Sequence, residues 1–333
     1  MDILILDAHQ VRQLLPMAAC IDVMAQALTA LTRGEAQNPL RTMMWLPDQH
    51  GLLVTMPASM GDAMGIKVIS VMPGNHGSEY DSHMGAVLLF EAAHGRPLAL
   101  IDASEITAIR TAAVSGVATR LLAQEDAGDL AILGTGVQAD SHLEAMLAVR
   151  PIRRVRVWSR NSANRAQLAA RAKARYGVTV EPVDSAEAAV RGADIICTAT
   201  SAAEPVLRGE WLSAGAHLNV VGASTPKARE VDSTAMRRSR LFVDRRESTL
   251  NEAGDFLIPK QEGVIGDDHI LAELGEVLLG QKPGRSAPDE ITLFKSLGLA
   301  VEDLASAQYI YQKAVEKGIG TAVAFGALRT DSH

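Results

Sequence analysis

The chain has 333 residues, of which 47% are hydrophobic and 21% charged, and its formal net charge is −7 at pH 7. At about 150 residues per domain this length predicts two domains, and the composition is typical of a globular protein with a buried core. The acidic balance argues against nucleic acid as the main partner. No run approaches the roughly 18 apolar residues of a membrane span, so we also expect no membrane partner.

Two further observations bear on the compartment. The apolar run Ile3 to Leu6 is flanked by Asp2 and Asp7 and lacks the basic region and the length of a signal peptide. The two cysteines, Cys20 and Cys197, lie in unrelated contexts, so no disulfide framework is expected. We therefore expect a cytoplasmic protein in a reducing environment.

The first third of the chain predicts a strand-rich domain. A short strand and a helix, Leu15 to Thr32, are closed by Gly34. Alternating segments punctuated by Pro, Gly, Asn and Asp then predict strands at Arg41–Trp45, Gly51–Met56, Met64–Ser70, Ala86–Phe90 and Pro97–Asp102. An Ala-rich helix, Glu105 to Leu122, carries the chain into the second domain.

From Gly128 onward, short apolar strands alternate with helices. The strands are expected at Leu130–Leu133, Val155–Trp158, Ile195–Thr198, His217–Val221 and Leu241–Val243, and later helices at Ile270–Leu279 and Leu304–Glu316. Such alternation predicts an α/β fold, a Rossmann doubly wound parallel sheet. We expect residues 121–302 to form this domain, and residues 1–120 and 303–333 to form an α+β domain built from both chain ends.

One stretch, Asp129 to Ala139, carries a dinucleotide-binding pattern. An apolar strand breaks into Gly-x-Gly-x-x-Ala and then into a helix. Gly134 allows the tight turn, Gly136 lets a pyrophosphate approach the backbone, and Ala139 lets the helix pack closely on the strand. The N–H groups at the start of that helix would face the phosphates.

Adenosine specificity is read at the end of the second strand of such a sheet, where an NAD-binding protein usually has an acidic residue. This chain has Ser159, Arg160 and Asn161 instead. A guanidinium with hydroxyl and amide neighbours suits a 2′-phosphate, so NADPH (NADP) is the expected cofactor and NADH a possible one. A solvated surface arginine is the alternative, since other arginines lie close by.

Three cations stand out in or beside the first domain's strands: Arg41, Lys67 and Arg110. Lys67 lies inside an apolar strand, where a charge is usually paired or functional. Each of the three could be a structural or surface charge. Together they could clamp a small carboxylate, because Arg offers bidentate geometry and Lys a point charge.

Metal and hydrolase chemistry are not supported. The spacing of His76 and His83 matches no usual ligand pair, and no third ligand accompanies them, so we expect no metal. Ser115-Gly116 and Thr200-Ser201 do not form a nucleophile elbow.

The chain resembles the ornithine cyclodeaminase/μ-crystallin family over nearly its whole length. The matching stretches are Arg41 to Ala58, Gly65 to Lys67, Ile106 to Ala113, Leu133 to Ala139, Gly222 to Pro226 with Arg229 and Glu230, and Phe294 to Gly298. This resemblance implies a homodimer whose first domain binds substrate and forms the dimer interface. It also assigns the substrate carboxylate to Arg41, Lys67 and Arg110, in agreement with the clamp.

The resemblance further implies a set of cofactor contacts, which join Gly134, Ser159 and Asn161 from the motifs above. Ser82, which occupies a position that is Thr in some relatives, is included. The implied contacts are Ser82, Arg110, Thr111, Gly136, Val137, Gln138, Arg160, Thr200, Val221 and Ser296.

One departure from the family pattern bears on the reaction. Ornithine cyclodeaminases carry an Asp where this chain has Ser224, and a Lys where it has Ala228. A serine hydroxyl cannot act as a base near pH 7 without activation. At this point the chain is similar to the μ-crystallin branch, which implies NAD(P)H-dependent reduction of small cyclic ketimine carboxylates to cyclic L-amino acids, with Ser224 near the substrate.

In that reaction Lys67 is a candidate catalytic acid beside Arg110, and a substrate that arrives already protonated is an equally good account. Two alternative functions stay open. The first is an ornithine cyclodeaminase or an NAD(P)-dependent amino-acid dehydrogenase. The second is an NADP-bound binding protein with little turnover.

Overall fold

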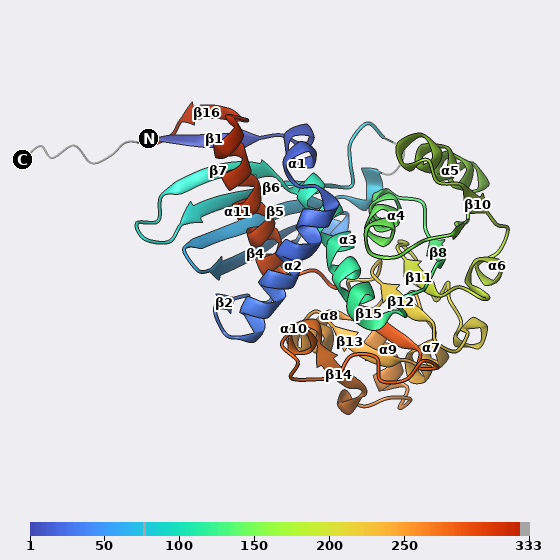
Figure 1. Ribbon diagram of the computed structural model, residues 1–333. Coiled ribbons are helices and arrows are strands. Elements are labelled where there is room, and N and C mark those ends of the chain that lie inside the picture. Colours follow the sequence, from blue (N-terminus) through green and yellow to red (C-terminus); the bar gives the residue numbers. More distant parts are fainter. Residues whose placement is uncertain (76–77, 327–333) are drawn as a thin grey trace, which may run out of the picture. The chain divides into compact units, whose positions relative to one another are not determined.

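The computed structural model describes residues 1–75 and 78–326, so His76 lies outside the described residues (Figure 1). The chain divides into two compact units. The first consists of Met1–Arg110 and Leu299–His333, and the second of Thr111–Gly298. Both boundaries precede those expected from the sequence, 120/121 and 302/303, and the first lies inside helix α3 (Ala103–Leu122).

The first unit contains an eight-stranded sheet. Its order is β16-β1-β7-β6-β5-β4-β2, with β3 also paired to β4, and only β1 and β7 run parallel. The strands are β1 (Asp2–Leu6), β2 (Ala36–Gln37), β3 (Thr42–Trp45), β4 (Leu52–Met60), β5 (Ala63–Val71), β6 (His83–Glu91), β7 (Pro97–Asp102) and β16 (Thr321–Ala324). The 3₁₀ turns η1 (Pro47–Gln49) and η2 (Pro73–Asn75) join strands.

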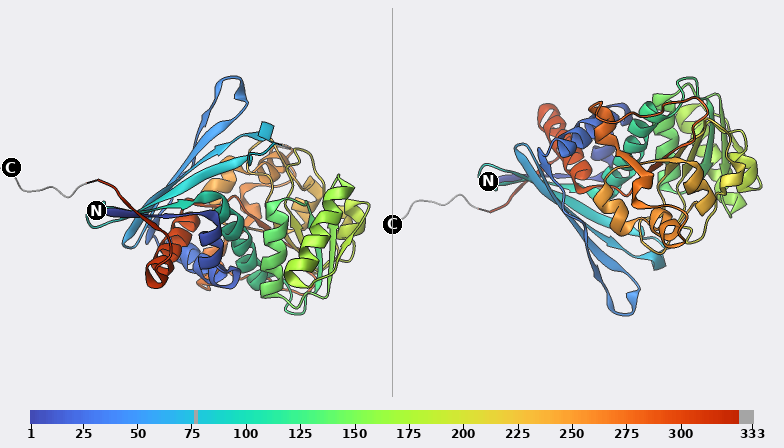
Figure 2. Two further views of the ribbon diagram at one scale, coloured as in Figure 1. Left: turned by 90° about the horizontal axis from the view of Figure 1, so that it is seen from above. Right: turned by 90° about the horizontal axis from the view of Figure 1, so that it is seen from below.

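Helices of this unit cover one face of the sheet. They are α1 (Ala8–Leu14), α2 (Met17–Thr32) and α11 (Ala300–Lys317), and both views in Figure 2 place α2 and α11 on the same side. A capping box of Asp7 and Gln10 begins α1. The sequence analysis did not predict this helix. Alternate residues of β5 face α11: a Cβ at Gly65 would lie 3.1 Å from Cδ1 of Leu304.

The second unit contains an eight-stranded sheet in which every pairing is parallel, with the order β10-β9-β8-β11-β12-β15-β13-β14. The chain winds outward from β8 in one direction and then returns to β11 beside it. This is the doubly wound arrangement predicted from the sequence, and its switch point lies between β8 and β11. The strands are β8 (Asp129–Leu133), β9 (Arg154–Trp158), β10 (Val180–Pro182), β11 (Ile195–Thr198), β12 (His217–Val220), β13 (Arg240–Val243), β14 (Ile270–Glu273) and β15 (Thr292–Lys295).

Seven helices within this unit connect the strands. They are α4 (Val137–Val149), α5 (Ser162–Tyr176), α6 (Ala186–Val190), α7 (Ser233–Arg238), α8 (Arg246–Glu252), α9 (Gly254–Gln261) and α10 (Leu274–Leu278), with the 3₁₀ turns η3 (Gly209–Trp211) and η4 (Asp267–His269). Leu133 and Leu218, on one face of the sheet, are fully buried in a core that also contains Phe256 of α9.

The helix predicted over Ile270–Leu279 is wrong in its first half. Ile270–Glu273 forms β14 at the edge of the sheet, and only Leu274–Leu278 is helical. Four residues with alternating burial fit a strand as well as one turn of helix, and pairing with β13 decides between them. Across residues 1–75 and 78–326, no single helix is long and apolar enough to cross a membrane, and the bent pair α1 and α2 qualifies by length and composition only.

Candidate functional site

Apart from Thr111, which lies in α3, the predicted cofactor residues of the second unit follow the carboxyl ends of five strands. Because these strands are parallel, their carboxyl ends meet at one edge of the sheet. Gly134 and Gly136 follow β8, Ser159–Asn161 follow β9, Thr200 follows β11, Val221 follows β12 and Ser296 follows β15. Positions separated by more than 150 residues in the sequence are thus brought to the same edge.

The glycine turn after β8 has the geometry that the sequence pattern requires. Gly134 has φ 119°, and a Cβ there would lie 2.2 Å from the carbonyl oxygen of Ala199, at the end of β11. Only glycine fits so close an approach. Gly136 precedes α4, and a Cβ on it would meet nothing within 4 Å, so the space beside the helix N-terminus is open. Val137 and Gln138 form the first helical turn. These features fit a dinucleotide pyrophosphate.

Beside the end of β9, Arg160 is exposed and has no hydrogen bond or ion pair within the described residues. The neighbouring Arg154 and Arg156 are engaged with Glu181 and Asp129. Asn161 has a structural task, because its Oδ1 accepts hydrogen bonds from the N–H groups that begin α5. Arg160 therefore has the freedom to bind an anion, whereas the side-chain oxygen of Asn161 is already used.

Buried Glu230, which the sequence analysis quoted without a role, organises the loops after β11 and β12. One carboxylate oxygen accepts from the N–H of Thr200 (2.7 Å) and its hydroxyl (2.7 Å). The other accepts from the hydroxyl of Thr198 (2.8 Å) and the N–H of Gly222 (2.6 Å). Burial raises the pKa of Glu230, and the charge of Asp255 raises it further. All four donors point at the carboxylate, so this acid fixes the backbone at Thr200 and at Gly222.

A second buried pair extends this network to β15. Asp255 accepts hydrogen bonds from the N–H groups of Glu230 (2.7 Å) and Val231 (3.1 Å) and pairs with Nζ of Lys295 at 3.0 Å. Lys295 also donates to the carbonyl oxygen of Ala223 at 2.6 Å. The adjacent Ser296 hydroxyl is buried and, within the described chain, has no hydrogen-bond partner. An unpaired buried hydroxyl at this edge fits a polar group of a bound cofactor.

In the first unit, Lys67 on β5 is 2% exposed. Its Nζ lies 3.0 Å and 3.1 Å from the two carboxylate oxygens of Asp303, on α11, and 3.0 Å from Oγ1 of Thr107. The Thr107 hydroxyl donates its own hydrogen to the carbonyl of Ala103, so it accepts from the ammonium. Burial lowers the pKa of Lys67 to about 8; Asp303 opposes this shift, whereas Arg110 and Arg41 add to it.

The second predicted cation, Arg110, is 4% exposed at the end of the first unit's part of α3. Its Nε donates to Oδ1 of Asp303 at 2.9 Å and its Nη1 donates to Oε2 of Glu302 at 2.8 Å. Burial opposes the charge of this guanidinium, but the two carboxylates outweigh it and raise the pKa of Arg110. Lys67 and Arg110 therefore share one carboxylate, that of Asp303.

The remaining predicted residues are less tightly held. Arg41 precedes β3 and is half-buried, and its charge is close enough to lower the pKa of Lys67. Ser82 is half-buried and its hydroxyl lies 3.0 Å from Nδ1 of His83. Ser224 is half-buried after β12, and its hydroxyl makes no hydrogen bond to any described residue. Thr111 is buried in α3. No group of three or more His, Cys, Asp or Glu with metal-binding geometry occurs among residues 1–75 and 78–326.

Sequence reasoning missed Glu302 and Asp303. A signal was present, since two adjacent acids interrupt the apolar start of a helix, but the expected boundary at 302/303 separated them. Lys295 carried the same signal as Lys67, a charge within an apolar strand, and was not interpreted.

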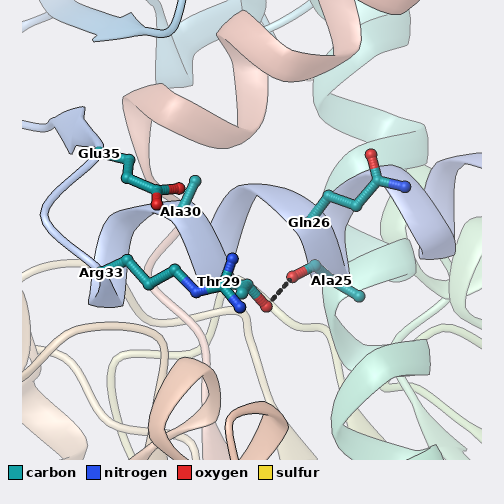
Figure 3. Close-up of a pocket in the computed structure, with 6 residues that line it drawn as sticks. All are labelled: Ala25, Gln26, Thr29, Ala30, Arg33 and Glu35. Atoms are coloured by element: carbon teal, nitrogen blue, oxygen red, sulfur yellow. Dashed lines mark hydrogen bonds between the residues drawn. The ribbon is translucent and has the colours of Figure 1, made fainter.

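None of these residues lines a surface hollow of about 270 Å³ in the first unit (Figure 3). It is lined by Ala25, Gln26, Thr29, Ala30, Arg33 and Glu35, from α2 and the turn after it. The Thr29 hydroxyl is bonded to the carbonyl oxygen of Ala25 within the helix. No predicted site residue lines this hollow, and we assign no ligand to it.

A profile of the ornithine cyclodeaminase/mu-crystallin family matches residues 1–318. The chain belongs to this family. The ketimine reductase mu-crystallin of Mus musculus is 42% identical over 280 residues, which cover 84% of this chain and 85% of the mouse protein.

Two solved structures extend the comparison. Δ1-pyrroline-2-carboxylate reductase of Thermococcus litoralis, in complex with NADH and L-proline, is 41% identical with a TM-score of 0.94 and covers 96% of this chain and 100% of its own. An archaeal alanine dehydrogenase dimer with bound NAD is 31% identical with a TM-score of 0.93 and covers 98% of this chain and 100% of its own. Imine reductases and an amino-acid dehydrogenase are thus among the proteins that this chain resembles.

Proposed function

We propose that this protein is an NAD(P)H-dependent reductase of small cyclic ketimine carboxylates, of the Δ1-pyrroline-2-carboxylate or Δ1-piperideine-2-carboxylate type, that forms cyclic L-amino acids. The observation that carries the proposal is the buried pair of Lys67 and Arg110 in the substrate unit of a chain whose other unit fits a dinucleotide. The names of the mouse and Thermococcus relatives supply the substrate class.

In this proposal Arg41, Lys67 and Arg110 bind the substrate carboxylate. Nε and Nη1 of Arg110 are already held by acids, and its Nη2 makes no hydrogen bond within the described residues, so Nη2 is left for the substrate. A charge-assisted hydrogen bond there aligns the ring as well as binding it. Fixing the imine carbon in this way lowers the barrier by removing rotational and translational freedom.

The bound dinucleotide supplies a hydride to the imine carbon. Lys67 supplies a proton to the imine nitrogen. A pKa of about 8 leaves the ammonium largely protonated at pH 7 and still able to give up its proton. Thr107 and Asp303 hold the ammonium in place while it acts.

Ser224 separates this reaction from ornithine cyclodeamination. A cyclodeaminase must remove a proton from the distant ammonium of its substrate so that the amine can attack. The Ser224 hydroxyl cannot take that proton near neutral pH, and no described residue is hydrogen-bonded to it as an activating base. The carboxylate clamp favours an enzyme over a binding protein.

We further propose that NADPH is preferred and NADH is accepted. Arg160 is exposed and unpaired in the described part of the chain, at the strand end where the adenosine ribose is read. A guanidinium there attracts a 2′-phosphate, and none of Ser159, Arg160 and Asn161 is acidic. The Thermococcus structure holds NADH, so acceptance of the unphosphorylated cofactor is expected as well.

A homodimer formed by the first unit is also part of the proposal. A row of apolar side chains crosses its sheet on the face opposite α11, with Ile5 paired to Leu100, Leu100 to Leu88, and Leu88 to Ile66. Ile5 and Leu100 are 37% and 36% exposed, although both lie within strands. Burying such a row against a second copy removes apolar surface from water. The archaeal alanine dehydrogenase is described as a dimer.

The test is NADPH and NADH oxidation with five- and six-membered cyclic ketimine carboxylates. Open-chain keto acids with ammonia or methylamine serve as comparison substrates, and ornithine with NAD or NADP is assayed for ammonia. We expect turnover with a cyclic ketimine and no ammonia from ornithine. Robust ammonia release from ornithine would support a cyclodeaminase. A preference for pyruvate with ammonia would support an alanine dehydrogenase. No turnover at all would support a binding protein.

A further inference from the structure

Two adjacent acids on α11 enclose the two buried cations of the first unit. Asp303 contacts both, with Oδ1 shared between Lys67 (3.1 Å) and Arg110 (2.9 Å) and Oδ2 bonded to Lys67 alone (3.0 Å). Of the two cations, Glu302 contacts Arg110, at 2.8 Å, and it also accepts from the N–H of Leu299. Both acids are at most 1% exposed. The order of contact is therefore Lys67, Asp303, Arg110, Glu302.

This order gives the two acids different consequences. Glu302 fixes one edge of the guanidinium and does not contact Lys67. Asp303 fixes the other edge and at the same time sets where the ammonium lies. Since the edges bearing Nε and Nη1 are taken, the direction of Nη2 is set by both acids together. Neither acid needs to touch a substrate to control how one is held.

We propose that Asp303 is a positioning residue for ketimine reduction, which couples the proton donor Lys67 to the carboxylate ligand Arg110 through one shared oxygen. This inference rests on the proposed function. Glu302 differs from it in contacting Arg110 but not Lys67. Buried ion pairs of this kind contribute little net stability, because desolvation cancels much of the attraction. What such pairs contribute to an active site is a fixed position for each charged group.

The shared carboxylate also determines when Lys67 carries a proton. The charged groups that face Lys67 are Asp303 from α11, Arg110 from α3 and Arg41 from the segment before β3, with Glu302 behind Arg110. Asp303 favours the ammonium, whereas burial and the two arginines disfavour it. Removing the negative charge must lower the pKa of Lys67 below its value of about 8. Because the reaction uses protonated Lys67, activity then falls at a lower pH.

The experiment compares Asp303→Asn with Glu302→Gln, each of which removes one buried negative charge from the same helix. For the wild type and both variants, kcat and KM are measured with a cyclic ketimine between about pH 6 and pH 10. NADPH binding is followed separately by fluorescence, and folding by circular dichroism. We expect Asp303→Asn to lower kcat. We also expect it to shift the descending limb of the pH profile of kcat/KM to lower pH, by about one unit or more. Glu302→Gln should raise KM and leave the limb in place.

An unchanged limb in Asp303→Asn, or an equal shift in Glu302→Gln, would overturn the coupling while leaving the reductase assignment intact. Absence of wild-type turnover would instead overturn the proposed function. If Asp303→Asn fails to fold, Asp303→Glu replaces it, since it keeps the charge and displaces the carboxylate by one methylene. It should retain the limb and lose kcat, and wild-type kcat in this variant would refute the positioning role.

Discussion

Replacing Glu230 with Gln should weaken the dinucleotide site although Glu230 need not touch the cofactor. Each carboxylate oxygen of Glu230 accepts from one backbone N–H and one hydroxyl, Thr200 N–H and Oγ1 on one side, Gly222 N–H and Thr198 Oγ1 on the other. The Gln amide nitrogen is a donor and must face one of these two sides. A hydroxyl can rotate and accept from it, but a backbone N–H cannot.

Either orientation of the amide therefore leaves one buried backbone N–H unpaired, that of Thr200 or of Gly222. An unsatisfied buried donor costs about 1–3 kcal/mol. We expect a loss of that size in the free energy of unfolding. NADPH binding has to restore the position of Thr200, and the share of the cost that falls on this step raises the Kd for NADPH. Each ~1.4 kcal/mol of that share corresponds to a tenfold higher Kd.

The assay is fluorescence titration with NADPH together with denaturant unfolding of the same preparations. Glu262→Gln is the matched control, because Glu262 belongs to the same unit but is 40% exposed and pairs with Arg229 at the surface. Its replacement should change stability by less than about 1 kcal/mol and leave NADPH binding as in the wild type. Wild-type stability and Kd in Glu230→Gln, or equal losses in both variants, would refute the role assigned to the network.

Three other predictions concern single contacts. Gly134→Ala should abolish dinucleotide binding in fluorescence titrations and lower stability, since its Cβ would lie 2.2 Å from the carbonyl oxygen of Ala199. Gly136→Ala, whose Cβ would meet nothing within 4 Å, should lose binding without losing stability. Arg160→Asp should weaken NADPH far more than NADH, and equal losses would contradict the NADP preference. Leu88→Arg should convert a dimer to a monomer in sedimentation, because a charge enters the apolar row; an unchanged mass would place the interface elsewhere.

The features that the sequence predicted well depend on local patterns. The Gly-x-Gly-x-x-Ala stretch, the alternation of short apolar strands with helices, and the charge at Lys67 inside an apolar strand can all be read within a dozen residues. Once the sheet is known to be parallel, the common edge for Gly134, Arg160 and Thr200 follows from topology alone. Ser296 is different, because it follows β15, a strand that the sequence analysis did not predict. The doubly wound fold could therefore be predicted from the sequence.

The features that it did not predict depend on distant pairs. Lys67 and Asp303 are separated by 236 positions, and Arg110 and Asp303 by 193. No spacing rule connects such residues, and an acidic pair at the start of a helix is most often a solvated feature that complements the helix dipole. The strand at Ile270–Glu273 was missed for a different reason, since four residues are too few to show a period.

Both missed networks have the same physical form, and this bears on why they exist. In each, a fully buried acid, Glu230 or Asp303, holds groups that the sequence analysis assigned to a ligand. Burying these charges costs desolvation, and well-packed apolar residues of equal volume would commonly stabilise a fold at least as well. What apolar residues would not provide is a fixed direction for a backbone N–H at Thr200 or for an ammonium at Lys67. We infer that the geometry of these donors, rather than stability, is what the buried acids contribute.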